Sequence, residues 1–322
     1  MKRRYMLASI AAGLMAGSVL ASEDVAPMII NGTEANASDY PYFASLYYDL
    51  RGQGGYAHNY CGATVIDEYH VLTAAHCVLD KDYNEKTKIA LQVQDENYPD
   101  AVETAWASEF YLHPFYVDGF NALWANDIAI IKLATPLKTP NIKATFGVDA
   151  DRTNYSTGSA QLTILGHGDT WSGHYYNEDY SDSLESAQVS FLEMCTEQGA
   201  IETPSRSICV TGEVVGSKRK APCTGDSGGP LVWQDTDNNV TKIIGVTSYG
   251  PSVCGWQGEQ LAGVYTEIAT YTDWIDGIVS GTSDQQPYYV VGSAGGDSSS
   301  GGGSLGWLAL LGLFGLGFWR RN

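Results

Sequence analysis

The chain has 322 residues, and 37 Asp and Glu against 18 Lys and Arg give it a formal net charge of -19 at pH 7. Nucleic-acid binding needs clustered cations against the phosphates, so this balance argues against a nucleic-acid partner. It suits a protein that its own negative charge keeps dispersed in solution, and we expect a monomer.

Residues 1–21 have the pattern of a secretory signal peptide. Lys2-Arg3-Arg4 forms a basic start, an apolar run of small residues follows from Leu7 to Leu20, and Ala21 ends a small-residue cleavage site. The apolar run is short and ends in this site, which favours a cleaved signal over a retained membrane helix. The protein is therefore expected to be exported to a compartment in which disulfides persist.

About 250 residues after the leader suit one folded unit of two packed halves. Short β-rich runs, separated by Gly, Asn, Asp and Pro, occur at 42–48, 128–133, 161–165 and 242–247. A helical pattern appears only near the end, where Ile268, Tyr271, Ile275 and Ile278 recur at three- or four-residue spacing. These patterns predict an all-β protein with one C-terminal helix.

Three short motifs carry the chemistry: TAAHC around His76, NDIAI around Asp127 and CTGDSGGP around Ser227. A serine hydroxyl is a poor nucleophile unless a base takes its proton, and that base needs a third group to orient it. The order His, Asp, Ser is one of several chain orders known for such triads. On these motifs the chain resembles the chymotrypsin/trypsin family of serine endopeptidases, with matching landmarks from Ile29 to Ile278.

The resemblance implies two six-stranded antiparallel Greek-key barrels, with the active site in the cleft between them and a helix at the C-terminus. His76 and Asp127 would then come from the first barrel and Ser227 from the second. The backbone N–H groups of Gly225 and Ser227 would form the oxyanion hole, and Ser248 would hydrogen-bond Asp127. Polypeptides are the expected substrates, and no cofactor is expected.

Six cysteines allow fifteen pairings, and the sequence alone does not choose among them. The resemblance implies three pairs, namely Cys61–Cys77, Cys195–Cys209 and Cys223–Cys254. The first would brace the loop that carries His76, and the third would tie the segment before Ser227 to a neighbouring wall of the pocket.

Metal-binding motifs do not fit. Neither C-x-x-C nor H-E-x-x-H occurs, which argues against zinc. The segment from Asp80 imitates the start of a calcium loop, but Glu85 stands where Gly is needed and Leu91 where Glu is needed, so it is not an EF-hand. No metal ligand set is predicted, while a calcium site of the family's kind in this loop stays open.

The sequence Ile29-Ile30-Asn31-Gly32 resembles the N-terminus that family members gain when a zymogen is cleaved. In that case the α-amino group of Ile29 would pair with Asp226, and residues 22–28 would be an activation propeptide. Residue 28 is Met, where trypsin-type activation sites carry Arg or Lys, so activation by an outside trypsin-like enzyme is not expected. Residues 29–280 would form the protease domain.

The primary specificity pocket departs from that of trypsins. The residue six positions before Ser227, which forms the pocket floor in the family, is Ala221, where trypsins carry Asp. Ser248 would belong to the strand that pairs with the substrate backbone, and Gly250 and Gly263 would form walls without side chains. A neutral, open pocket predicts cleavage after large apolar residues such as Tyr, Phe, Leu or Met.

Other readings stay open. The basic run Lys218-Arg219-Lys220 could select acidic residues, and a family protease could also prefer small ones. A catalytically dead family member could serve as a surface binding protein or adhesin. Such proteins usually lose one triad residue, and this chain keeps all three.

The C-terminal region reads as a linker followed by a sorting tail. Residues 281–303 are rich in Gly and Ser and predict a flexible linker, while 304–322 hold an apolar run that ends in Arg320-Arg321. The run from Leu305 to Trp319 makes a helix of roughly 22 Å, shorter than a hydrocarbon core of roughly 30 Å.

This arrangement looks like the GlyGly-CTERM tails of exported proteins of Gram-negative bacteria, which a rhomboid-type membrane protease removes. The resemblance implies a transient inner-membrane stage and then release to the cell surface or medium. The alternative is a permanent membrane anchor.

Overall fold

The computed structural model describes residues 29–96, 103–168, 183–193, 195 and 206–292. The predicted signal peptide and propeptide lie outside these ranges, as do residues 293–322, which include the whole predicted tail. Among the helices within the described ranges, none combines the length and the apolar character that crossing a membrane requires.

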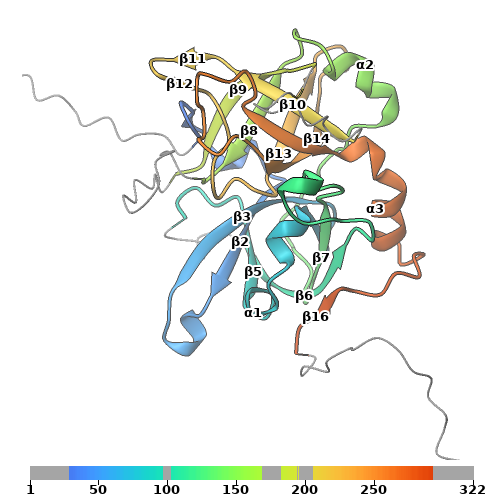
Figure 1. The fold of residues 1–322 in the computed structure, drawn as a ribbon. Helices are drawn as coiled ribbons and strands as arrows, with labels where there is room; N and C mark the ends of the chain where they lie inside the picture. Colours follow the sequence, from blue (N-terminus) through green and yellow to red (C-terminus); the bar gives the residue numbers. More distant parts are fainter. Residues whose placement is uncertain (1–28, 97–102, 169–182, 194, 196–205, 293–322) are drawn as a thin grey trace, which may run out of the picture.

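The first barrel is closed by six antiparallel strands in the described ranges (Figure 1): β2 (Phe43–Asp49), β3 (Ala57–Val65), β4 (His70–Thr73), β5 (Thr87–Leu91), β6 (Thr104–Leu112) and β7 (Ala129–Leu133). Around the ring the order is β2, β3, β4, β7, β6, β5, and pairing of β6 with β7 closes it. Apolar side chains that point inward from these strands form its core, and Phe43, Leu72, Ile89 and Phe110 are at most 1% exposed.

The second barrel has the same closed construction: β8 (Leu162–Gly166), β9 (Glu185–Phe191), β10 (Ser207–Gly212), β13 (Pro230–Asp235), β14 (Val240–Tyr249) and β15 (Gly263–Glu267). Pairing of β8 with β9 and with β13 closes the ring. A short hairpin of β11 (Val214–Val215) and β12 (Lys218–Arg219) projects from it. The predicted fold of two six-stranded antiparallel barrels is therefore confirmed.

Short helices connect and cap the strands: η1 (Ala37–Asp39), η2 (Arg51–Gln53), η3 (Ala75–Val78), α1 (Lys81–Asn84), η5 (Phe120–Ala122), η6 (Asp149–Asp151), α2 (Arg152–Tyr155), η7 (Ile268–Thr270) and α3 (Thr272–Val279). The predicted C-terminal helix is α3, and it buries Ile275 and Ile278 as expected. It begins at Thr272 because the preceding residues form the tighter turn η7.

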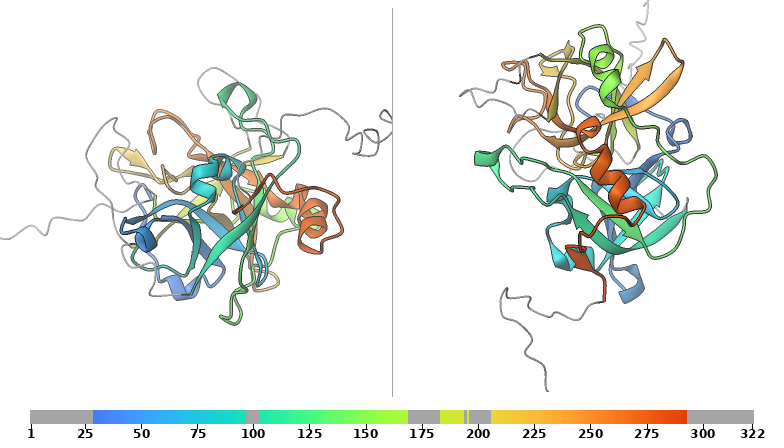
Figure 2. Two further views of the ribbon diagram at one scale, coloured as in Figure 1. Left: turned by 90° about the horizontal axis from the view of Figure 1, so that it is seen from below. Right: turned by 90° about the vertical axis from the view of Figure 1, so that its right-hand side faces the viewer.

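Each barrel also carries a two-residue strand at its edge. Near the N-terminus, β1 (Thr33–Glu34) pairs with β9 of the second barrel. After α3 the chain returns to the first barrel, where β16 (Tyr289–Val290) pairs with β6. Figure 2 shows this return in its right-hand view, from α3 down onto the first barrel. The beginning of the predicted flexible linker, residues 281–292, is thus packed against the folded domain.

Candidate active site

His76 and Asp127 meet because two neighbouring strands deliver them. His76 lies in η3, three residues after β4, and Asp127 lies two residues before β7, which pairs with β4. The Asp127 carboxylate is fully buried and accepts hydrogen bonds from His76 Nδ1 (2.8 Å) and from the His76 backbone N–H (3.0 Å). Because a carboxylate only accepts, this contact requires the proton on Nδ1 and leaves Nε2 free to take one.

The surroundings of His76 act on its pKa in opposite directions. Burial lowers the pKa because it disfavours the imidazolium. The hydrogen bond that His76 donates to Asp127, the charge of Asp127 and the charge of Asp118 raise the pKa, and together they outweigh the effect of burial. The pKa of His76 therefore lies above its ordinary value.

The second barrel also holds Asp127. Ser248, in β14, donates a 2.5 Å hydrogen bond to Oδ2 of Asp127, and Thr266, in β15, donates to its backbone carbonyl (2.8 Å). Sequence analysis predicted a hydrogen bond between Ser248 and Asp127, and the structure contains one. Sequence analysis did not predict the contact of Thr266, because no motif surrounds this residue.

Ser227 lies in a tight loop that packs directly on the first barrel. Its carbonyl accepts the N–H of Gly62, in β3, at 2.7 Å. Gly228 follows with φ 78°, and a Cβ there would lie 2.2 Å from Oγ1 of Thr73, three residues before His76. The loop thus needs glycine at 228 in order to approach the histidine side of the cleft.

The Ser227 side chain is partly exposed. Within the described ranges its hydroxyl makes no hydrogen bond with Nε2 of His76. Nucleophile–base contacts are often long before a substrate binds and tighten in the reacting complex.

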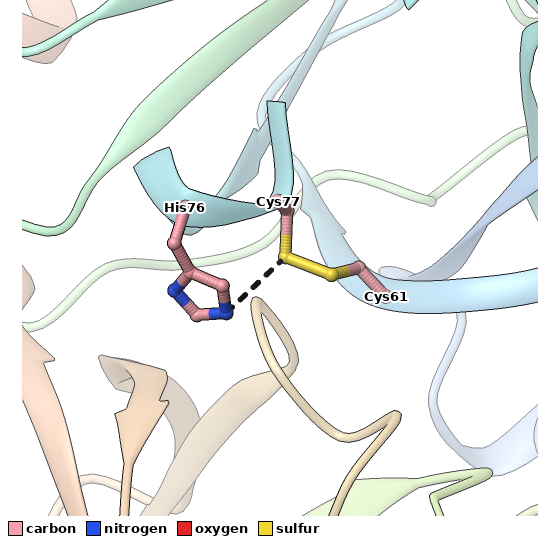
Figure 3. Close-up of side chains that lie close together, drawn as sticks. All are labelled: Cys61, His76 and Cys77. Atoms are coloured by element: carbon pink, nitrogen blue, oxygen red, sulfur yellow. Dashed lines mark hydrogen bonds between the residues drawn. A yellow bond between two sulfur atoms is a disulfide. The ribbon is translucent and has the colours of Figure 1, made fainter. Parts of the chain in front are cut away.

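A disulfide braces the histidine from the first barrel. Cys61, in β3, is bonded to Cys77, and Figure 3 shows the pair beside the His76 ring, with Nε2 of His76 3.8 Å from Sγ of Cys77. These three residues have the elements of a metal site. Both sulfurs are committed to the disulfide, however, and a metal would need a thiolate.

All six cysteines lie in the described ranges and are paired. Besides the pair beside His76, Cys195 is bonded to Cys209 and Cys223 to Cys254. Cys223 opens the loop that contains Ser227, while Cys254 lies between β14 and β15. The disulfide therefore ties the serine loop to the segment that follows β14.

Asp226 is a buried carboxylate next to Ser227. Its Oδ1 accepts the N–H of Gly168 (2.9 Å) and its Oδ2 the N–H of Cys223 (2.8 Å), and only 2% of the residue is exposed. Gly225 adopts φ 98°, where a side chain would be strained and where a Cβ would lie 2.9 Å from the Cα of Gly168. This conformation orients the turn on which the predicted oxyanion hole depends.

The predicted new N-terminus is buried in the second barrel. Ile29 is fully buried, and Ile30 exchanges backbone hydrogen bonds with Ala221 at 3.0 and 3.3 Å. The segment therefore packs beside the predicted pocket floor.

The predicted pocket residues converge, and they bring in one residue that sequence analysis missed. Ala221 is fully buried. A Cβ on Gly263 would lie 2.8 Å from Cγ of Pro222, and one on Gly250 would lie 3.2 Å from the carbonyl of Ala262. The proline ring thus lies against Gly263, one of the two predicted wall residues. Pro222 directly follows the predicted floor residue Ala221 in the sequence, and this neighbourhood could have identified it.

The basic run beside the pocket makes contacts elsewhere. The Arg219 guanidinium donates to the carbonyls of Glu259 and Gly212 (3.0 and 2.6 Å), and Lys220 bonds Glu213. These cations are engaged within the second barrel and its hairpin.

A hollow of about 330 Å³ is lined by Asn126, the residue before Asp127, and sequence analysis did not predict it. Its lining includes Ser248, Thr266, Trp124 and Tyr249, and the two aromatic ring centroids are 5.2 Å apart. Trp124 has φ 45°, a turn conformation that no sequence pattern marks for a tryptophan.

Comparisons with known proteins cover almost all of the two barrels. The family model named Trypsin matches residues 29–275. The chain is similar to beta-fibrinogenase brevinase of Gloydius blomhoffii, at 31% identity over 262 residues, 79% of this chain and 97% of the relative. Trypsin-1 of Astacus astacus is 30% identical over 251 residues, 77% of this chain and 98% of the relative. A trypsin of Phaedon cochleariae is 27% identical over 248 residues, 77% and 87% of the two chains.

Proposed function

The chain belongs to the trypsin family of serine endopeptidases, and we propose that His76, Asp127 and Ser227 are the catalytic triad of this enzyme. The observation that carries the proposal is the buried Asp127 carboxylate, bonded to His76 Nδ1 and aligned from the other barrel by Ser248. A dead binding protein or adhesin would have no use for a histidine whose second nitrogen is kept ready to accept a proton.

The mechanism follows from these positions. Ser227 Oγ attacks the carbonyl carbon of the scissile peptide while its proton passes to Nε2 of His76. The resulting oxyanion is bound by the backbone N–H groups of Gly225 and Ser227. His76 then gives the proton to the leaving amine, and water repeats the sequence on the acyl-enzyme. Asp127 stabilises the imidazolium in both halves of the reaction.

The enzyme is made as a zymogen, and removal of residues 22–28 frees the α-amino group of Ile29 to pair with Asp226. Support comes from the complete burial of Ile29 and the near-complete burial of Asp226 in the second barrel. A buried carboxylate is stable when paired and hydrogen-bonded, and the new amino group would add the opposite charge.

Cleavage follows large apolar side chains. Ala221, Pro222 and Gly263 offer no charge to an Arg or Lys side chain, whose desolvation would cost several kcal/mol. Selection of acidic residues would require the basic run at 218–220, but Arg219 and Lys220 are bonded elsewhere. The same pocket would accept Met28, which allows the enzyme to mature itself in trans.

The three disulfides are consistent with a secreted, extracellular enzyme. We further propose that residues 304–322 are a GlyGly-CTERM-type tail, supported by the glycine-rich, apolar and Arg–Arg pattern alone. A rhomboid-type protease of a Gram-negative inner membrane would remove it. Mass spectrometry of the protein from producing cells should then show a C-terminus at or before Leu305, whereas an intact Arg320-Arg321 end would support a permanent anchor.

The function is tested by peptide hydrolysis with protein that begins at Ile29, compared with Ser227→Ala. The variant should fold normally and lose about 10⁴- to 10⁶-fold in kcat, because the triad acts as a unit. Retention of more than a few per cent of the activity would remove Ser227 from the mechanism.

A further inference from the structure

Residues 281–292, the C-terminal strap, lie beyond the part of the chain that matches the family. The strap leaves α3 through Gly281, which has φ 69°. Gln285 then bridges two elements: its Oε1 accepts from Nε1 of Trp274 in α3 (2.9 Å), and its Nε2 donates to the carbonyl of Leu112, the last residue of β6 (2.6 Å).

The strap next adds a strand to the first barrel. The N–H of Tyr288 donates to the carbonyl of Phe110 (2.7 Å), and that of Val291 donates to Ser108 (2.9 Å). Strand addition at a sheet edge relies on backbone hydrogen bonds and requires no particular side chains, so a polar, glycine-containing sequence can pair in this way.

The same segment binds the chain on the C-terminal side of His76. Leu79 directly follows η3, the 3₁₀ turn that carries His76, and its carbonyl accepts a hydrogen bond from the hydroxyl of Tyr288 at 3.0 Å. Glu85 directly follows α1, and its carboxylate accepts hydrogen bonds from the hydroxyl of Tyr289 and from the N–H of Gly292 (3.0 Å). The strap therefore holds both ends of the segment 79–85.

We propose that the strap positions His76. The turn η3 has four residues, and a 3₁₀ turn of that length has few and poorly aligned internal hydrogen bonds. Its orientation therefore depends on what fixes its ends. Asp127 and the Cys61–Cys77 disulfide act at His76 itself, and the strap acts on the C-terminal side through Leu79 and Glu85. In this role Tyr288 and Tyr289 are positioning residues.

The proposal rests on the proposed catalytic role of His76, and it predicts a specific kinetic pattern. The strap contacts the first barrel and α3, while the predicted primary pocket lies in the second barrel. Loss of the strap should therefore lower kcat and leave KM within about twofold. A small displacement of a catalytic group can cost up to about a hundredfold in rate.

The first test uses the full chain activated at Ile29. In Tyr288→Phe/Tyr289→Phe both rings stay and both hydroxyls are lost. We expect kcat to fall by about threefold to tenfold, a part of the roughly hundredfold that a displaced catalytic group can cost, at a temperature well below the melting point. Tyr69→Phe is the matched control, because Tyr69 is 44% exposed against 41% for Tyr288 and lies on the first barrel away from the strap. It should keep the parent kcat.

The second test compares proteins that end at Gly292 and at Ser280. The first keeps the strap and should match the full chain, and the second should lose about tenfold to a hundredfold in kcat. If the shorter protein does not fold, the double tyrosine variant decides. Unchanged kcat in the double variant, even with a lower melting temperature, would reduce the strap to a stabilising element and overturn the proposal. Inactivity of the parent and of every variant would instead refute the proposed function.

Discussion

Ser248 of the second barrel donates a 2.5 Å hydrogen bond to Oδ2 of Asp127, which belongs to the first barrel. The same oxygen accepts Nδ1 of His76 at 2.8 Å. One carboxylate oxygen thus links the candidate base to both barrels. The orientation of the imidazole therefore depends on how the barrels pack against each other.

Replacement of Ser248 with alanine should lower both activity and stability. The change leaves a fully buried carboxylate oxygen with one donor fewer, at a cost of about 1.5–3 kcal/mol. If the same free energy is lost from the stabilisation of the transition state, kcat/KM falls by roughly tenfold to a hundredfold. Peptide kinetics and urea unfolding measure the two effects. Ser159→Ala, at an exposed serine near α2, is the control. Unchanged kinetics in Ser248→Ala would show that Asp127 does not need this donor.

The raised pKa of His76 predicts the acid limb of the pH–rate profile. The base must be neutral to accept the proton, so activity should fall as pH drops through a pKa that lies above the ordinary value of 6.5. The stabilising contact between the imidazolium and Asp127 has the opposite dependence. It is complete below the unfolded pKa and is lost as pH rises through the folded pKa. In Asp127→Asn the acid limb should move to lower pH, and a limb that stays in place would contradict the assignment.

The fold was predictable from the sequence because its motifs resemble those of a family whose members share one architecture. The alternating pattern of the strands indicated an all-β protein without that resemblance. The same resemblance predicted the three disulfides and the contact between His76 and Asp127, which the structure contains. Pro222 and Trp124 were missed because their contacts depend on a close approach and an unusual backbone conformation. The strap was missed because its composition is that of a linker, while its anchors are backbone N–H groups and the carbonyls of Phe110 and Leu79.

A protein with one extra residue before Ile29 should be nearly inactive, because its amino group cannot reach Asp226. On the proposed activation, pairing with the Asp226 carboxylate would raise the pKa of the Ile29 amino group. The stabilisation is then complete below the unfolded value, about 7.7–8.0, and is lost as pH rises through the folded value. Activity should therefore also fall on the alkaline side. Full activity of the extended protein would exclude zymogen activation.

Matched peptides with Phe, Met, Glu or Arg before the scissile bond test the pocket. We expect Phe and Met to be cleaved with the higher kcat/KM, since the predicted floor residue Ala221 and the neighbouring Pro222 and Gly263 carry no charge. A clear preference for Arg would refute the pocket assignment. Failure to cleave after Met would exclude self-activation at Met28 but would not contradict the proposed triad.

Covalent labelling shows whether Ser227 is a nucleophile that His76 activates. Protein that begins at Ile29 is treated with a fluorophosphonate, and its modified peptide is identified by mass spectrometry, beside His76→Ala and Ser227→Ala. We expect one adduct, on Ser227, whose formation slows by several orders of magnitude without His76 and stops without Ser227. An adduct on another residue, or equal labelling of the His76→Ala protein, would contradict it.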